Sequence, residues 1–165
     1  NTTGNIQVAV DAVCAAQSPH HFLSVSSQGD AAIVSTRGNK DAHIILRGGQ
    51  INTNFDESSI KNSKRLLLDQ NCCESIMIDC SHGNSSKDHR KQALVVDSIA
   101  QQIASGERGI TGVMLESNLV AGKQALSSRG DLVFGQSVTD GCIDLEQTDQ
   151  LLEKLSDAVQ KRQSL

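Results

Sequence analysis

Apolar residues recur along the chain with two different periods, which predict helices and strands in turn. Spacing of three and four residues predicts helices over residues 5–17, 58–69, 93–104 and 145–162. Two short strands, 21–26 and 31–36, flank a turn that contains Gly29. We therefore expect residues 21–36 to form an antiparallel β-hairpin.

Four further apolar runs predict parallel strands, at residues 42–46, 75–79, 109–115 and, as a short stub, 137–139. Nearly continuous runs suit strands that are buried on both faces of a sheet. Because strands alternate with helices, we predict an α/β fold in which the four strands lie side by side with helices on one face. Four such units amount to half of an eight-stranded (β/α)8 TIM barrel. A doubly wound sheet is the alternative, but no GxGxxG motif follows a strand. The stretch 120–135 is predicted to be a long loop.

A functional side chain follows each of these four strands: Arg47, His82, Glu116 and Asp140. Parallel strands place their carboxyl ends on one rim, which is where the sites of α/β barrels lie. One imidazole and two carboxylates form a ligand set suited to a divalent Mn, Fe, Co or Zn ion. Arg47, beside two glycines with free backbone N–H groups, suits a phosphate.

Each of these residues also has a simpler interpretation when it is taken alone. His82 is compatible with a hydrogen-bonding loop residue, and Arg47 with pairing to any nearby carboxylate. Glu116 could form a salt bridge or cap a helix, and Asp140 could cap the turn before the last helix. A Ser-His-Asp triad through Ser81 lacks the GxSxG context.

Composition narrows the class of protein further. The chain has 165 residues, a net charge of −4 and no Trp or Tyr, which argues against nucleic-acid binding. No apolar run reaches the roughly 18 residues that a membrane span needs. Five cysteines without a CxxC pair favour reduced thiols in a cytoplasmic protein over a zinc ribbon. Because the chain opens on Asn1, we expect a processed protein or a piece of a longer one.

Four ordered motifs resemble one enzyme family over nearly the whole chain. Residues 43–49 match its HIILRGG segment, and residues 77–87 are similar to its MIDxSHxNSSK segment. Residues 112–117 resemble GVMxES, and residues 137–143 resemble SITDxCI. The family is the type I, microbial form of 3-deoxy-7-phosphoheptulonate synthase.

The resemblance implies an enzyme of aromatic amino acid biosynthesis, at the entry to the shikimate pathway. Enzymes of this family condense phosphoenolpyruvate with erythrose 4-phosphate on a metal-dependent (β/α)8 barrel, and the resemblance implies a homo-oligomer at full length. The metal ligands would be His82, Glu116 and Asp140, and Arg47 would bind the phosphoenolpyruvate phosphate. The hairpin would be the insert that helps to bind an inhibiting aromatic amino acid.

The sequence also departs from the family pattern. Cys80, Gly83, Asn118 and Leu145 stand where other residues are expected. The family's cysteine metal ligand, its KPRT segment for erythrose 4-phosphate, and further phosphoenolpyruvate-binding arginine and lysine residues lie in the first half of the barrel. This chain matches the C-terminal half as a single partial domain over residues 1–165. We therefore expect it to be inactive alone. The alternative is a non-catalytic half-barrel that binds or assembles with another chain.

Overall fold

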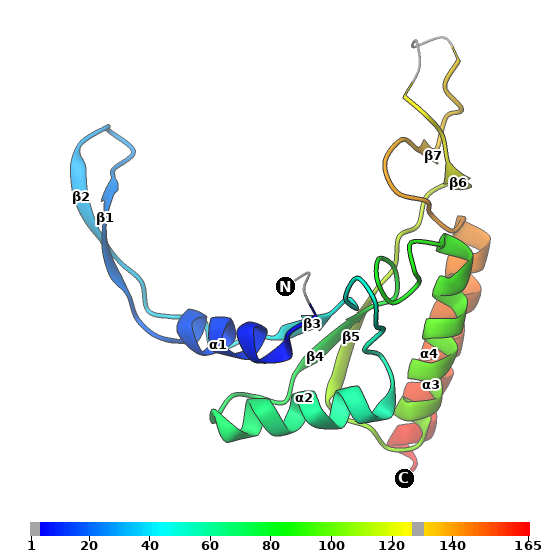
Figure 1. Ribbon diagram of the computed structural model, residues 1–165, viewed down its shortest axis with the longest axis horizontal. Helices are drawn as coiled ribbons and strands as arrows, with labels where there is room; N and C mark the ends of the chain where they lie inside the picture. The colour runs from blue at the N-terminus through cyan, green and yellow to red at the C-terminus, as the bar shows by residue number, and fades with distance from the viewer. Residues whose placement is uncertain (1–3, 127–130) are drawn as a thin grey trace.

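The computed structural model describes residues 4–126 and 131–165 (Figure 1). Residues 127–130 of the predicted loop, and the first three residues, therefore lie outside the described part. The helices occur where the periodicity placed them: α1 (Ile6–Gln17), α2 (Glu57–Asp69), α3 (Gln92–Ala104), preceded by the 3-10 turn η1 (His89–Lys91), and α4 (Leu145–Gln163). No helix within the described ranges has the length and hydrophobicity that crossing a membrane demands.

The predicted hairpin is present at residues 21–35. Strand β1 (His21–Val25) pairs antiparallel with β2 (Ala31–Ser35), and the pair extends away from the rest of the molecule (Figure 1). Several of its large apolar side chains are exposed, with Leu23 at 82% and Ile33 at 72%. This hairpin therefore contributes little to the core.

The central sheet contains three parallel strands in sequential order. Strand β4 (Ile76–Asp79) lies between β3 (Ile44–Leu46) and β5 (Ile110–Met114). A doubly wound sheet reverses its strand order at a switch point, and these three strands show no such reversal. Sequential parallel pairing brings all three carboxyl ends to one edge of the sheet.

The prediction of a fourth strand beside these three is wrong. Residues 136–137 form β7 (Gln136–Ser137), which pairs in parallel with β6 (Val120–Lys123), a strand inside the stretch predicted to be loop. After β5 the chain continues in an extended form, and there Ser117 forms a single parallel bridge with Ile143. Gly122 and Lys123 hid the β6 strand, because a glycine and a charged residue weaken its apolar pattern.

Only one face of the sheet is covered, which differs from the predicted burial on both faces. Ile44 and Leu46 pair with Ile76 and Ile78, and all four are buried in a core shared with the helices. On the opposite face Ile45 is 40% exposed. The helices pack on the first face, as predicted, and none of the described residues fills the second.

The side chain of Asn84 ties the carboxyl ends of β3 and β4 together. It is 4% exposed, and its amide donates hydrogen bonds to the carbonyl oxygens of Leu46 (3.0 Å) and Asp79 (2.9 Å). Its Oδ1 accepts from the N–H of Asn54 at 2.9 Å. One buried amide thus satisfies backbone groups of two strand ends and of the loop after β3.

We predict that Asn84→Ala destabilises the fold by about 3 kcal/mol, because it leaves buried carbonyl groups without donors. Urea unfolding followed by circular dichroism measures this loss. Asn62→Ala, at an exposed position of α2, is the matched control and should change stability by less than about 0.5 kcal/mol. Equal unfolding midpoints for the two variants would contradict the role given to Asn84.

Candidate metal and anion site

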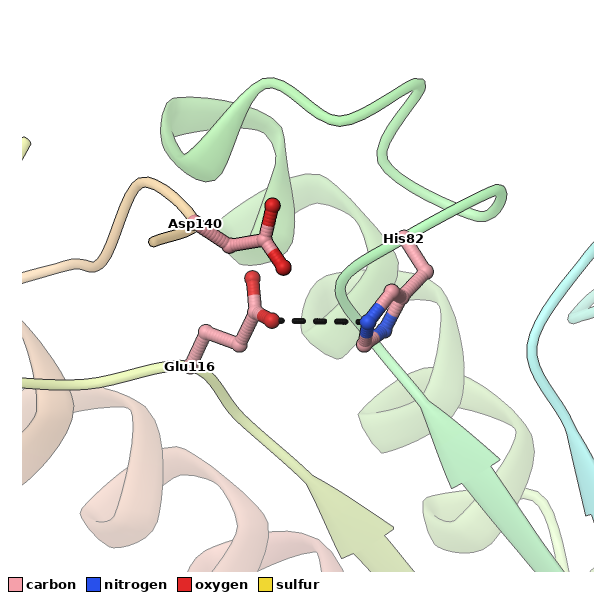
Figure 2. Close-up of side chains that lie close together, drawn as sticks. All are labelled: His82, Glu116 and Asp140. Atoms are coloured by element: carbon pink, nitrogen blue, oxygen red, sulfur yellow. Dashed lines mark ion pairs between the residues drawn. The ribbon is translucent and has the colours of Figure 1, made fainter. Parts of the chain in front are cut away.

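Three of the four predicted site residues lie together at the rim of the sheet. His82 follows β4, Glu116 follows β5, and Asp140 lies between β7 and α4. One potential ligand atom from each lies within 4.8 Å of the others (Figure 2). The nearest ring nitrogen of His82, Nε2, is 3.5 Å from Glu116 Oε1. The predicted convergence of these side chains is therefore confirmed.

Asp140 enters this cluster by a different route from the one predicted. It does not follow a strand of the central sheet, because its loop reaches the rim after β7. Two backbone hydrogen bonds then hold the chain beside β5: Ile143 N–H donates to Glu116 O (2.9 Å), and Asn118 N–H donates to Ile143 O (2.9 Å). The N-cap of α4 is Asp144 rather than Asp140.

His82 is fixed through its Nδ1 atom and its backbone. Nδ1 lies 2.8 Å from Oδ2 of Asp79 and 2.7 Å from Oγ of Ser81. Its φ of 45° is in the left-handed region, which non-glycine residues rarely adopt. This backbone turns the ring toward Glu116 (Figure 2). Because Ser81 and Asp79 both contact the same ring nitrogen, the serine-protease arrangement, which uses the two different nitrogens, is excluded.

The backbone of Glu116 is held by a buried glutamine at the start of α3. Gln92 is fully buried, donates from Nε2 to Glu116 O (3.0 Å), and accepts at Oε1 from Glu116 N–H (2.9 Å). This pair of bonds imitates the partner strand that Glu116 lacks on that side. Sequence reasoning missed Gln92, because its partner Glu116 lies 24 residues away, and also missed Asp79, whose partners Ser81 and His82 are close in sequence.

The electrostatics of the cluster favour a cation. Partial burial and the charges of Asp140 and Asp79 raise the pKa of Glu116 above its ordinary value, and His82 and Arg47 oppose this only in part. A raised carboxyl pKa means that the ionised form is disfavoured where it stands. A bound divalent cation would reverse that preference, since it would attract both carboxylates.

Arg47 lies beside the cluster without joining it. Its Nε atom is 3.9 Å from Asp79 Oδ2, and its side chain is one-third exposed, so it can still meet a ligand. The predicted free N–H groups of the two glycines are not free. Gly48 N–H donates to Asn54 Oδ1 and Gly49 N–H to Asn52 O, both at 2.8 Å. Anion binding here would therefore depend on the guanidinium.

Comparison with known proteins supports the family indicated by the motifs. Residues 2–153 match the model of the DAHP synthetase I family. A putative phospho-2-dehydro-3-deoxyheptonate aldolase of Schizosaccharomyces pombe is 52% identical over 99% of this chain. The Phe-sensitive aldolase of the same name from Escherichia coli K12 is 49% identical over 98% of it.

A solved structure agrees with these sequence matches. The phospho-2-dehydro-3-deoxyheptonate aldolase of Francisella tularensis SCHU S4 superimposes with a TM-score of 0.92 at 49% identity, over 98% of this chain and 47% of that one. The S. pombe and E. coli matches cover 45% and 46% of those proteins, so the chain spans about half the length of these relatives. The chain belongs to the DAHP synthetase I family.

Proposed function

We propose that this chain supplies the metal-binding and phosphate-binding rim of a 3-deoxy-7-phosphoheptulonate synthase. The observation that carries this proposal is the convergence of His82, Glu116 and Asp140 at the carboxyl edge of a parallel sheet, in a chain of this family. The reaction condenses phosphoenolpyruvate with erythrose 4-phosphate. In this proposal the sheet is the second half of a (β/α)8 barrel, and its open face is where the first half packs.

The donor set fits a divalent first-row metal. A neutral imidazole and two carboxylates are ligands that Mn, Fe, Co and Zn accept, and none of the three side chains is buried enough to exclude an ion. When bound, such an ion supplies Lewis-acid polarisation of the aldehyde oxygen. His82, Glu116 and Asp140 would hold it.

Arg47 takes the phosphate of phosphoenolpyruvate in this proposal. Guanidinium groups bind phosphate through two parallel charge-assisted hydrogen bonds. The position supports this role, because Arg47 follows β3 while His82 follows the neighbouring β4, and both side chains lie within reach of Asp79. The substrate's anionic end and the metal would thus be held by adjacent strands.

The exposed hairpin supports a regulatory role for an aromatic amino acid. The relative of Saccharomyces cerevisiae is named as phenylalanine-inhibited, that of Candida albicans as tyrosine-inhibited, and that of E. coli as Phe-sensitive. The apolar side chains of β1 and β2 would contribute to that binding site once another chain or segment covers them.

The competing function is a non-catalytic module that associates through its apolar surfaces. Exposed Ile45 on the open sheet face and exposed Leu23 on the hairpin favour association. This hypothesis explains the exposed apolar surfaces as well as the proposed function does. It does not explain why three potential ligand side chains converge at the rim.

We predict that calorimetry will detect weak Mn or Zn binding by the chain, with an affinity that His82→Ala abolishes. Three protein ligands allow binding, and the loss of one leaves too few to retain an ion against water. His43→Ala is the matched control, because His43 is exposed at the opposite, amino-terminal end of β3. Binding that survives His82→Ala, or that disappears in His43→Ala, would show that the ligand assignment is wrong.

We predict that the 165-residue chain alone forms no measurable seven-carbon product. The family places a cysteine ligand, lysines and the erythrose 4-phosphate segment outside the part matched here, and each missing preorganised group costs about 10²–10³ in rate. The assay follows the loss of phosphoenolpyruvate absorbance with erythrose 4-phosphate and Mn present.

The same assay is repeated after adding the first half of a relative's barrel as a separate polypeptide. Activity that appears only with the added half, and not when the chain carries Arg47→Ala, supports the proposed function. Turnover by the chain alone would refute both the predicted inactivity and the hypothesis of a non-catalytic module. No turnover with any first half, although the halves associate, favours the module.

A further inference from the structure

Asp79 is a buried carboxylate at the end of β4 whose two oxygens meet different partners. It is 2% exposed. Oδ1 accepts from Ser81 N–H (2.9 Å) and from Ser81 Oγ (2.6 Å). Oδ2 lies 2.8 Å from His82 Nδ1 and 3.9 Å from Arg47 Nε. One carboxylate therefore contacts both the candidate metal ligand and the candidate phosphate-binding residue.

These contacts determine which nitrogen of His82 carries the hydrogen. A carboxylate only accepts hydrogen bonds, so the 2.8 Å contact between Asp79 Oδ2 and Nδ1 requires a hydrogen on Nδ1. The hydroxyl of Ser81 does not replace that donor, because it already donates to Asp79 Oδ1 at 2.6 Å. In a neutral imidazole the hydrogen on Nδ1 leaves Nε2 with a free lone pair.

We propose that Asp79 is a positioning residue that sets the tautomer and the ring orientation of His82, and so presents Nε2 to a metal held with Glu116. This proposal rests on the proposed function, because it presumes that the ion binds at this rim. The direction of Nε2 supports it, since that nitrogen faces Glu116 Oε1 at 3.5 Å (Figure 2). A carboxylate behind a ligating histidine fixes its tautomer and raises its basicity.

The backbone of His82 needs the same support. Its left-handed φ of 45° is strained for a residue with a Cβ, and the surrounding bonds hold it there. Lys87 N–H donates to His82 O at 2.7 Å, and Ser85 Oγ donates to it at 3.3 Å. With the backbone fixed in this way, the remaining freedom of the ring is its rotation, which Asp79 restricts.

The first test is nitrogen-15 NMR of the histidine rings in the metal-free wild-type chain. The His82 signals are identified by their absence in His82→Ala. We expect Nδ1 to carry the hydrogen and Nε2 to be free. A wild-type His82 with its hydrogen on Nε2 would overturn the proposal.

The second test is Asp79→Asn, which keeps the size of the side chain. We expect a mixture of tautomers at His82 and a 10- to 100-fold weaker affinity for Mn or Zn. Asp69→Asn, at an exposed position of α2, is the control and should change neither. Wild-type affinity and an unchanged tautomer in Asp79→Asn would overturn the proposal. If the wild-type chain binds no metal, the proposed function fails, while the tautomer measurements still decide the role of Asp79.

A second, independent observation concerns two cysteines from different helical regions. Cys14 lies in α1, and Cys72 follows α2 by three residues. Their Sγ atoms are 3.0 Å apart, and Cys72 is 6% exposed. A disulfide needs about 2.05 Å, so a shift of about one ångström would join them. Both thiols are free in this structure.

We infer that Cys14 and Cys72 form a disulfide when the protein meets a small-molecule disulfide such as oxidised glutathione. The thiolate of Cys14 attacks one glutathione sulfur, forms a mixed disulfide and releases the first glutathione thiol. Cys72 then attacks Cys14 Sγ and releases the second. The two protein thiols lose two electrons and two protons, and one oxidised glutathione gains them as two thiols.

The order of the two steps follows from exposure. Cys14 is only partly buried, so the reagent reaches it first. The hydrogen bond with Cys14 and burial raise the pKa of Cys72 to about 11, so this thiol is a poor first nucleophile. The adjacent Cys73 is exposed and is the main competitor for the reagent.

Mass spectrometry of peptides after treatment with oxidised glutathione tests this inference. We expect a Cys14–Cys72 cross-link, a melting temperature raised by about 5–10 °C, and loss of both in Cys14→Ser. Cys73→Ser should keep the cross-link. A link between Cys14 and Cys73, or stable glutathionylation without a cross-link, would overturn it.

Discussion

Parallel pairing of β3, β4 and β5 is the constraint on which the rest of the structure depends. Antiparallel neighbours would send successive strand ends to opposite edges, and the side chains that follow them would never meet. Parallel pairing instead places Arg47, His82 and Glu116 on one rim, although they are separated by more than 30 residues in sequence. It also requires a helical crossover between strands, which explains why α2 and α3 lie on the same covered face as the core.

Strand direction brings the site residues near one another, and buried hydrogen bonds then fix their geometry. Asn84 binds the backbone of two strand ends, Gln92 binds that of Glu116, and Asp79 binds the side chain of His82. A buried polar group without its partner costs up to about 3 kcal/mol, so each loop is confined to the one conformation that satisfies these groups. The rim is therefore ordered by groups other than the candidate ligands themselves.

The sequence predicted the covered core and the side chains that meet at the rim because both depend on local pattern. Apolar spacing identified α1 to α4, and position after a strand identified His82 and Glu116. Long-range hydrogen bonds leave no such pattern. Nothing near Gln92 indicates that it will meet Glu116, 24 residues away. The sequence did not indicate that the N–H groups of Gly48 and Gly49 form hydrogen bonds within the protein, because their acceptors lie in the following loop. The fourth strand was misplaced for the same reason, since Ile143 joins the sheet edge through only one bridge.

The distribution of charge and burial at the rim explains how an ion would complete it. Three carboxylates face one guanidinium and one imidazole, and burial decreases from Asp79 through Glu116 to Asp140, which is exposed. The buried end is already hydrogen-bonded, whereas the exposed end is open to solvent. In the function proposed above, His82, Glu116 and Asp140 would together hold the cation, with Asp140 on the solvent side. Burial is the main cause of the raised pKa of Glu116, and the charges of Asp140 and Asp79 add to it; a cation between these groups would offset that repulsion.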